Sequence, residues 1–324
     1  MATTKEELPY GTWPSPITPD FITSSGVGLS GTTCPDPGSG DLFWLEARPE
    51  EGGRYVVVKR DPTSPDASER GAVDVIPKDH NARSRVHEYG GAAFVVDKDG
   101  SVIYSNFADQ RLYRVKSPGA DVENLTPKSA YEEDRRFRFA DGVIDTMRNR
   151  LICVREDYTS PKPVDVKNAI VAVTLDGTGT MRVLVEGSDF YAAPRLSPDG
   201  ESLAYVSWEH PNMPWDHTSL SVTRLDEAGL PTGESVCIAG GALSAGAGEA
   251  DSQPVAVSVL QPAWSPTTGE LHFVSDVTGW WNIYKIPAAA GPDLTSWRDA
   301  ALNLLPRDVE FSGRAPGWMF GNQG

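Results

Sequence analysis

Short apolar stretches recur along the chain, and Gly, Pro, Asp or Ser residues separate each one from the next. Five of them share one form, a turn followed by an apolar strand with a bulky residue near its middle. These five stretches are residues 41–46, 101–106, 150–155, 202–207 and 270–275. Short apolar runs bounded by turn residues are typical of strands, so the pattern predicts an all-β protein.

The five strands recur at a similar interval. Aligned on Leu42, Val102, Leu151, Leu203 and Leu271, they lie 60, 49, 52 and 68 residues apart. A further strand follows each of them, at residues 54–58, 111–115, 168–173, 218–222 and 281–286. Another strand precedes most of them, as at residues 90–96, 193–196 and 261–264. A four-stranded antiparallel unit of about 50 residues that repeats without helices predicts a β-propeller.

The turn between the first two strands of a unit has a recurring chemistry. Residues 97–100, 197–200 and 265–269 place Asp or Pro early and Gly late, and Asn149 takes the glycine position in the third unit. Proline presets φ near −65°, and glycine supplies the positive φ that closes a hairpin. The recurrence favours a propeller over the alternative, a β-sandwich. Residues 296–305, with Ser296 as a cap, are the best candidate for a helix.

We expect a single propeller domain over residues 1–324. Its blades are expected at roughly residues 20–80, 85–135, 136–190, 191–258 and 259–312. Residues 313–324 resemble the first strand of a sixth blade, since 314–321 matches the first strands of two earlier units. The sequence ends there, so five blades either close as a small ring or stay open and truncated. An open ring leaves an unpaired edge that favours self-association.

The amino-acid composition limits the kinds of partner that this protein is expected to bind. Lys+Arg total 29 and Asp+Glu total 45, which gives a net charge of −16 and argues against nucleic-acid or anionic-membrane binding. No apolar run is long enough for a transmembrane helix, and the polar start favours a cytoplasmic protein. Cys34, Cys153 and Cys237 are expected to be free thiols. No histidine pair has zinc-ligand spacing, and we expect no metal and no cofactor.

Six segments carry a resemblance to a known family. They are Tyr-Gly-Thr-Trp-Pro-Ser-Pro-Ile-Thr at 10–18, Arg-Ser-Arg-Val-His-Glu-Tyr-Gly-Gly at 83–91, Asn-Phe-Ala-Asp-Gln-Arg-Leu-Tyr-Arg at 106–114, Arg-Leu-Ser-Pro-Asp-Gly at 195–200, Trp-Glu-His-Pro-Asn-Met-Pro-Trp-Asp at 208–216 and Ser-Asp-Val-Thr-Gly-Trp-Trp-Asn-Ile-Tyr at 275–284. Together they resemble the N-terminal propeller of the prolyl oligopeptidase family of serine peptidases, and most closely its dipeptidyl-aminopeptidase-like and acylaminoacyl-peptidase-like members. The resemblance implies that an α/β-hydrolase domain with a Ser-Asp-His triad follows the propeller in relatives.

The chain itself has no sign of that hydrolase chemistry. The nucleophile of such enzymes stands in a Gly-x-Ser-x-Gly turn, and the sequence contains no such pentapeptide. The nearest segment, around Ser244, lacks the first glycine and lies in a Gly/Ala/Ser-rich stretch, residues 240–258, that is expected to be a flexible insertion. The five histidines show no triad arrangement. We therefore expect the chain alone not to hydrolyse peptides.

The resemblance also implies candidate substrate-binding residues. Glu88 precedes an expected inner strand and would hold the free amino terminus of a peptide, because a carboxylate matches an ammonium group. Arg85 and His87 would lie near the carbonyl groups of the peptide. The alternative is a structural ion pair or a blade-to-blade hydrogen bond. A tandem pair, Glu132 and Glu133, lies in an alternating-charge run and is expected to be a solvated surface.

Two aromatic loops complete the candidate site. The first, residues 208–216, contributes the side chains of His210, Asn212, Trp215 and Asp216. The second contributes Trp280 and Asn282. Long aromatic and polar loops on a rigid scaffold are typical binding elements, and proline-stiffened packing is the alternative.

These observations lead to one preferred function and two alternatives. The preferred one is a non-catalytic propeller of a prolyl-oligopeptidase-like peptidase that gates peptide access and contacts the substrate or a hydrolase domain. The first alternative is an autonomous scaffold that binds proteins or peptides. The second is a five-bladed glycosidase-like enzyme, in which Glu88 and Asp141 would supply the carboxylates.

Overall fold

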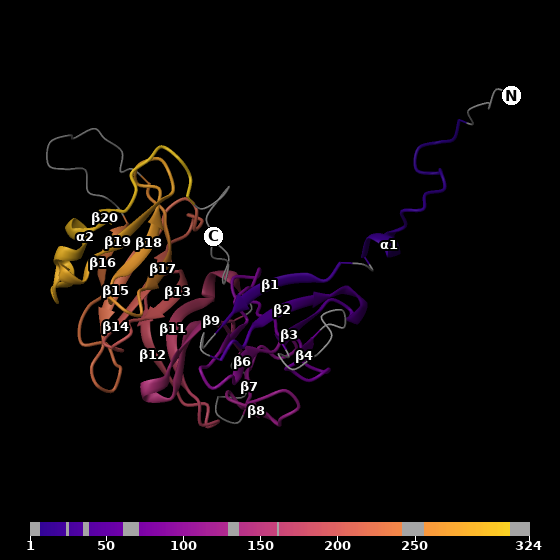
Figure 1. Ribbon diagram of the computed structural model, residues 1–324, viewed down its shortest axis with the longest axis horizontal. Helices are drawn as coiled ribbons and strands as arrows, with labels where there is room; N and C mark the ends of the chain where they lie inside the picture. The colour runs from indigo at the N-terminus through magenta and orange to yellow at the C-terminus, as the bar shows by residue number, and fades with distance from the viewer. Residues whose placement is uncertain are drawn as a thin grey trace.

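The computed structural model describes residues 7–23, 26–34, 39–60, 71–128, 136–160, 162–241 and 256–311. Within them, twenty strands form five antiparallel sheets of four strands each, and the strands of every sheet are hydrogen-bonded in chain order. The all-β prediction is confirmed, and the sheets are propeller blades (Figure 1). The assignment of residues 1–324 to a single domain stays a prediction.

The strands of the blades follow one another along the chain. Blade one contains β1 (Gly28–Thr33), β2 (Phe43–Arg48), β3 (Arg54–Arg60) and β4 (Ala72–Asp74). Blade two contains β5 (Phe94–Val96), β6 (Val102–Ser105), β7 (Leu112–Val115) and β8 (Val122–Asn124). Blade three contains β9 (Phe137–Asp145), β10 (Arg150–Asp157), β11 (Lys167–Thr174) and β12 (Met181–Glu186). Blade four contains β13 (Phe190–Leu196), β14 (Ser202–Trp208), β15 (Ser219–Arg224) and β16 (Val236–Gly240). Blade five contains β17 (Val259–Trp264), β18 (Leu271–Ser275), β19 (Asn282–Ile286) and β20 (Leu302–Asn303).

The first strands of neighbouring blades lie side by side. Figure 1 shows β9, β13 and β17 in a row, and β5 also contacts β9. The five blades form a propeller-like array that is not closed within the described residues. The segment 314–321, expected to begin a sixth blade, lies outside those residues, as do Glu132, Glu133, Ser244 and most of the insertion at 240–258.

The expected hairpin turns are present. Gly100, Gly200 and Gly269 have φ values of 83°, 73° and 69°, and Asn149 adopts the left-handed conformation with φ 48°. In the first two turns, the glycine amide donates a hydrogen bond of 2.9 Å to the carbonyl of Asp97 or Ser197. These are the conformations for which glycine and asparagine were expected.

Helices are short in the described part of the chain. The α-helices are α1 (Pro19–Thr23) and α2 (Trp297–Ala300), and the 3-10 turns are η1 (Pro49–Glu51), η3 (Thr146–Arg148), η4 (Pro163–Asp165), η5 (Ala288–Ala290) and η6 (Leu294–Ser296). None of the helices in the described segments has the length and apolarity needed to cross a bilayer.

The helix expected at residues 296–305 is wrong in its extent. It ends at Ala300, because residues 302 and 303 form β20 and complete the sheet against β19. Ser296 does not cap it through its side chain. Ser296 has helical backbone angles at the end of η6, and its hydroxyl donates back to the carbonyl of Asp293 at 2.8 Å.

Both faces of the middle strands are buried, which explains their nearly continuous apolar sequences. In β10, Ile152 and Val154 pack in a cluster with blades four and five, whereas Leu151 and Cys153 pack in a cluster with blade two. Alternate residues of a strand point to opposite faces, so each middle blade lies between two apolar layers. A third cluster joins blades one and two.

Candidate functional site

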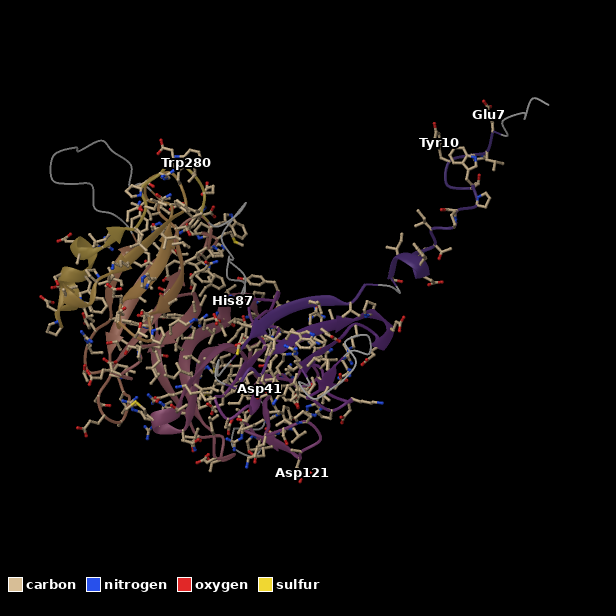
Figure 2. All side chains as sticks on the ribbon, viewed as in Figure 1. Glu7, Tyr10, Asp41, His87, Asp121 and Trp280 are labelled. Atoms are coloured by element: carbon tan, nitrogen blue, oxygen red, sulfur yellow. The ribbon has the colours of Figure 1, made fainter. Side chains whose placement is uncertain are left out.

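The predicted site residues lie at one face of the propeller. The segment between β4 and β5, the loop between β14 and β15, and the loop between β18 and β19 all open where the first strands of the blades begin, because strand direction alternates within each sheet. We call this the entry face. Asp41 precedes β2 and Asp121 lies between β7 and β8, so both lie in loops of the opposite face. Figure 2 shows Trp280 at the top of the molecule and Asp121 at the bottom. The topology therefore places the three predicted segments on a common face.

An ion cluster centred on Arg138 of β9 lies at the entry face. Its Nη1 donates to Glu88 Oε1 at 2.7 Å, to Glu156 Oε2 of β10 at 2.9 Å and to the carbonyl of Arg85 at 3.1 Å. The guanidinium also lies 3.9 Å from the ring centre of Tyr158. We call Glu88, Arg138, Glu156 and Tyr158 the Arg138 cluster.

The cluster has more negative than positive charge. One guanidinium serves two carboxylates, of which Glu156 is buried and Glu88 has 69% of its side chain exposed. Burial raises the pKa of the Glu156 carboxyl, and the charge of Arg138 acts in the opposite direction. Because the buried carboxylate needs Arg138 more than a hydrated one does, the unbalanced charge lies on the exposed Glu88.

A strained turn presents Glu88 to solvent. His87 and Glu88 have φ values of 54° and 65°, which are uncommon for residues with a side chain. The turn closes through hydrogen bonds of 2.9 Å from Glu88 N to Arg85 O and from Gly90 N to Val86 O. A Cβ on Gly90 would collide with the carbonyl oxygen of Ser84, so glycine is needed there. Backbone strain of this kind concentrates at functional sites.

His87 is buried behind this turn. Its ring makes edge contacts with Tyr89, Phe190 and Trp208 at centroid distances of 5.2 to 5.7 Å, and its backbone N–H donates to Glu156 Oε1 at 3.2 Å. Burial lowers the pKa of His87 to about 4, and a hydrogen bond with the Asn168 side chain acts in the opposite direction. The ring thus packs between blades, behind the turn that carries Glu88.

Arg85 is exposed beside Glu88. Its guanidinium lies 4.2 Å from the ring centre of Phe107, and its backbone N–H donates to Gln110 Oε1 at 2.7 Å. The stacking holds the planar group in place while leaving N–H donors available to a ligand carbonyl.

The loop between β14 and β15 is anchored and displays polar and aromatic groups. The Ser258 hydroxyl donates to the carbonyl of Pro214 at 2.5 Å, and Met213 N donates to Asp216 Oδ2 at 3.0 Å. His210 is exposed, and its backbone N–H donates to Asp189 Oδ2 at 2.9 Å. Trp215 is 43% exposed. Asn212 is half-buried, and its backbone N–H donates to the carbonyl of Glu209.

The two predicted residues of blade five have different environments. Trp280 is 38% exposed at the entry face. Asn282 is buried, and its Nδ2 donates to the carbonyls of Arg307 and Val309, both at 3.1 Å. Its Oδ1 accepts from Asn303 Nδ2 at 3.0 Å. The side-chain amide of Asn282 is therefore occupied by hydrogen bonds within blade five, and Asn282 is not part of the candidate site.

Asp141 is tied into the blade packing. It is buried, its Oδ2 accepts from Ala193 N at 2.6 Å and its Oδ1 accepts from Arg195 Nη1 at 3.0 Å. A carboxylate occupied in this way is not poised for proton transfer to a sugar. The glycosidase alternative, which paired Asp141 with Glu88, therefore has no support in the geometry.

Sequence reasoning missed three members of the Arg138 cluster. Arg138, Glu156 and Tyr158 become neighbours of Glu88 only when β9 and β10 pair and blade three packs beside the 84–90 turn. The signal that could have found them is the presence of Arg138 and Glu156 in strands that are otherwise largely apolar. A buried charge in a strand requires a partner.

Comparison with known proteins gives the family at the level of the propeller. No protein-family model and no curated protein sequence matches the chain. Among solved structures, a puromycin hydrolase variant complexed with PGG is 30% identical, with a TM-score of 0.76, over 96% of this chain and 44% of its own. A puromycin-hydrolyzing peptidase of Mycobacterium tuberculosis is 33% identical, with a TM-score of 0.73, over 98% of this chain and 44% of its own. The chain has the N-terminal propeller of the prolyl oligopeptidase family.

The match covers only part of those relatives. The chain spans less than half of their length, and the shared part is their N-terminal propeller. A more distant structure, an oligogalacturonate lyase in complex with manganese, is 14% identical with a TM-score of 0.53 and shares the fold alone. The predicted resemblance to the prolyl oligopeptidase family is thus confirmed.

Proposed function

We propose that this chain is the non-catalytic propeller of a prolyl-oligopeptidase-like serine peptidase. Its entry face admits peptides, and the Glu88 carboxylate binds their free amino terminus. The observation that carries the proposal is the Arg138 cluster, in which one guanidinium serves two carboxylates and the exposed carboxylate is Glu88. An ammonium group supplies the missing positive charge and up to three N–H donors.

The surroundings of Glu88 fit an extended peptide. Arg85 lies beside it with donors suited to the carbonyl of the first residue, while His87 keeps the turn rigid from behind. Trp215, His210, Asp216, Asn212 and Trp280, on the same face, form the rim through which a peptide would pass. In this proposal, these side chains gate the access of peptides to Glu88.

Hydrolysis is assigned to a second domain. The sequence contains no Gly-x-Ser-x-Gly pentapeptide, and the chain matches less than half of the puromycin hydrolases that it resembles. In this proposal the propeller selects substrates, and the hydrolase part of a complete protein cleaves them.

An apolar N-terminal arm supports contact with such a domain. Residues 7–23 extend away from the blades in Figure 1. Tyr10, Trp13, Phe21 and Ile22 are 96%, 53%, 60% and 67% exposed, and α1 buries none of its residues. Grouped large apolar side chains in water indicate a surface that another domain covers.

Peptide binding to the purified chain tests the role of Glu88. Isothermal titration would compare short peptides that have a free amino terminus with the same peptides acetylated. We expect about fivefold tighter binding of the free form, which corresponds to about 1 kcal/mol for a solvent-facing ion pair. Glu88→Gln should abolish this preference. Glu201→Gln, an exposed change in a hairpin of the opposite face, should preserve it. Equal binding of free and acetylated peptides by the unmodified chain would overturn the proposal.

A further inference from the structure

A cavity of about 570 Å³ lies at the flank of the propeller, between the outer strand β12 of blade three and the sheet of blade four. It is large enough for a small organic ligand. The Arg138 cluster and the 84–90 turn do not line it. It is therefore a second candidate site, independent of peptide recognition by Glu88.

A row of hydroxyl groups crosses the wall formed by blade four. Tyr191 of β13 pairs with Ser207 of β14, and Ser207 pairs with Ser219 of β15. Directly paired residues place their side chains on the same face of a sheet, about 5 Å apart. All three line the cavity. The row offers neighbouring polar contacts to a ligand that carries hydroxyl groups.

Ser207 is the member of this row that is most available to a ligand. The residue is 8% exposed, it lines the cavity, and its hydroxyl makes no hydrogen bond to another described residue. A bound molecule can therefore supply the hydrogen bond that the protein does not, as donor or as acceptor.

The charge of the lining is negative. Glu186 of β12 and Glu209, which follows β14, stand on the blade-three and blade-four sides, and neither forms an ion pair within the described residues. Glu209 Oε2 accepts one hydrogen bond of 2.9 Å, from Asp189 N. Glu234 also lines the cavity, and the lining includes no Lys or Arg.

Glu186 and Glu209 both influence the pKa of the Tyr191 hydroxyl. Burial raises the pKa of Tyr191, the hydrogen bond from Ser188 N lowers it, and the charges of Glu209 and Glu186 raise it again. Both carboxylates therefore act on the same buried hydroxyl. The aromatic rings of Tyr191 and Tyr205, 5.9 Å apart, complete this part of the wall.

Cys237 also lines the cavity, and Arg298 Nη2, outside the lining, lies 3.0 Å from its Sγ. A cation is favoured beside Glu186 and Glu209, because neither carboxylate has an ion-pair partner within the described residues. The described residues hold no group of three His, Cys, Asp or Glu side chains suited to a metal ion, so an organic cation fits better than a metal.

We propose that the cavity between blades three and four binds a small hydroxylated organic amine, with its ammonium group between Glu186 and Glu209 and a hydroxyl group on Ser207. The aromatic rings add a surface for the carbon skeleton and attract the positive charge. The class includes amino sugars and amino alcohols.

Glucosamine, glucose and N-acetylglucosamine form a suitable set of probes, to be titrated into the purified chain with ligand-observed NMR. We expect glucosamine to bind at least tenfold more tightly than the two neutral sugars. Binding should weaken about tenfold in a Glu186→Gln/Glu209→Gln double variant and about threefold in Ser207→Ala. Glu201→Gln should leave binding unchanged.

Several outcomes would overturn this proposal. One is equal binding of glucosamine and glucose, and another is the absence of saturation at about 10 mM glucosamine. A third is unchanged affinity in the double variant. The comparison among sugars uses the unmodified chain, so the test remains valid if a variant fails to fold. Peptide binding at Glu88 is measured separately, and either proposal can fail without the other.

Discussion

Asp141 of blade three accepts a hydrogen bond of 2.6 Å from the backbone N–H of Ala193 in blade four. The backbone N–H of Asp141 in turn donates to the carbonyl of Ala92 at 3.0 Å, beside blade two. Asp141, Ala193 and Ala92 all have positive φ, with values of 53°, 50° and 38°. A single residue in a left-handed bulge thus links three consecutive blades.

Replacing Asp141 should destabilise the propeller. Asp141→Ala removes the acceptor of Ala193 N and leaves Arg195 without its partner, so we expect a loss of about 3 kcal/mol in the free energy of unfolding. Asp141→Asn tolerates the left-handed backbone and keeps one acceptor, and should cost about half as much. Urea unfolding followed by circular dichroism measures both. Asp121→Ala, at an exposed position of the opposite face, is the control, and an equal loss there would contradict this assignment.

His87 should make stability depend on pH. Its folded pKa of about 4 lies below the usual histidine value, so the unfolded chain binds more protons in this range. The stabilisation is complete above about pH 6.5 and is lost as pH falls toward 4, with about 2 kcal/mol lost between pH 7 and pH 5. His87→Asn removes the titrating ring and suits the positive φ. The unfolding free energy of this variant should change less between those two pH values, and an unchanged difference would disprove the role of His87.

Arg138 should be coupled to Glu156. Arg138→Met leaves a buried carboxylate without its counter-charge, and we expect a loss of about 3 kcal/mol. Adding Glu156→Gln neutralises that carboxylate and should recover part of the loss. A double-mutant cycle based on thermal or urea unfolding measures the coupling. Strictly additive effects would show that the two side chains do not stabilise each other.

Gly90 should be more sensitive to substitution than Gly100. Both have positive φ, but a Cβ at Gly90 meets the carbonyl of Ser84, whereas a Cβ at Gly100 meets nothing within 4 Å. We expect Gly100→Ala to cost about 1 kcal/mol from backbone strain alone. Gly90→Ala should cost more and should also weaken the preference for free amino termini, because the turn positions Glu88. Equal melting temperatures for the two variants would contradict the close contact.

The N-terminal arm should contribute nothing to blade stability. Deleting residues 1–23 removes α1, which buries no residue, and the exposed side chains of Tyr10 and Trp13, so the free energy of unfolding should change by less than about 0.5 kcal/mol. Differential scanning calorimetry of the full and shortened chains measures this. A clear fall in melting temperature would show that the arm packs on the propeller and is not reserved for another domain.

The features that could be predicted from sequence are local ones. The second strands and the hairpins at Gly100, Asn149 and Gly200 follow from alternation and turn chemistry within a few residues, so their prediction succeeded. The same local reasoning placed a helix across residues 296–305. It failed at β20, a strand of two residues that forms because β19 offers an unpaired edge. Nothing in residues 302–303 themselves signals that pairing.

The candidate site depends on contacts between blades, and these contacts could not be predicted from the sequence as well as the local features. The position of Glu88 next to a first strand predicted its place at the entry face, where the other two predicted loops also lie. Its link to Arg138 comes from a residue 50 positions away, and the burial of His87 comes from Phe190 and Trp208 of blade four. Such neighbours depend on how sheets stack, a relationship that a single sequence does not encode in any short pattern.

Among the residues that the structure describes, the apolar interior is divided into three clusters, one between blades one and two, one between blades two and three, and one across blades three to five. Each cluster can lose its packing while the others keep theirs, as happens in arrays whose units touch only their neighbours. Unfolding is then expected to proceed in stages from the ends of the array inward, and a single melting temperature would average several local transitions.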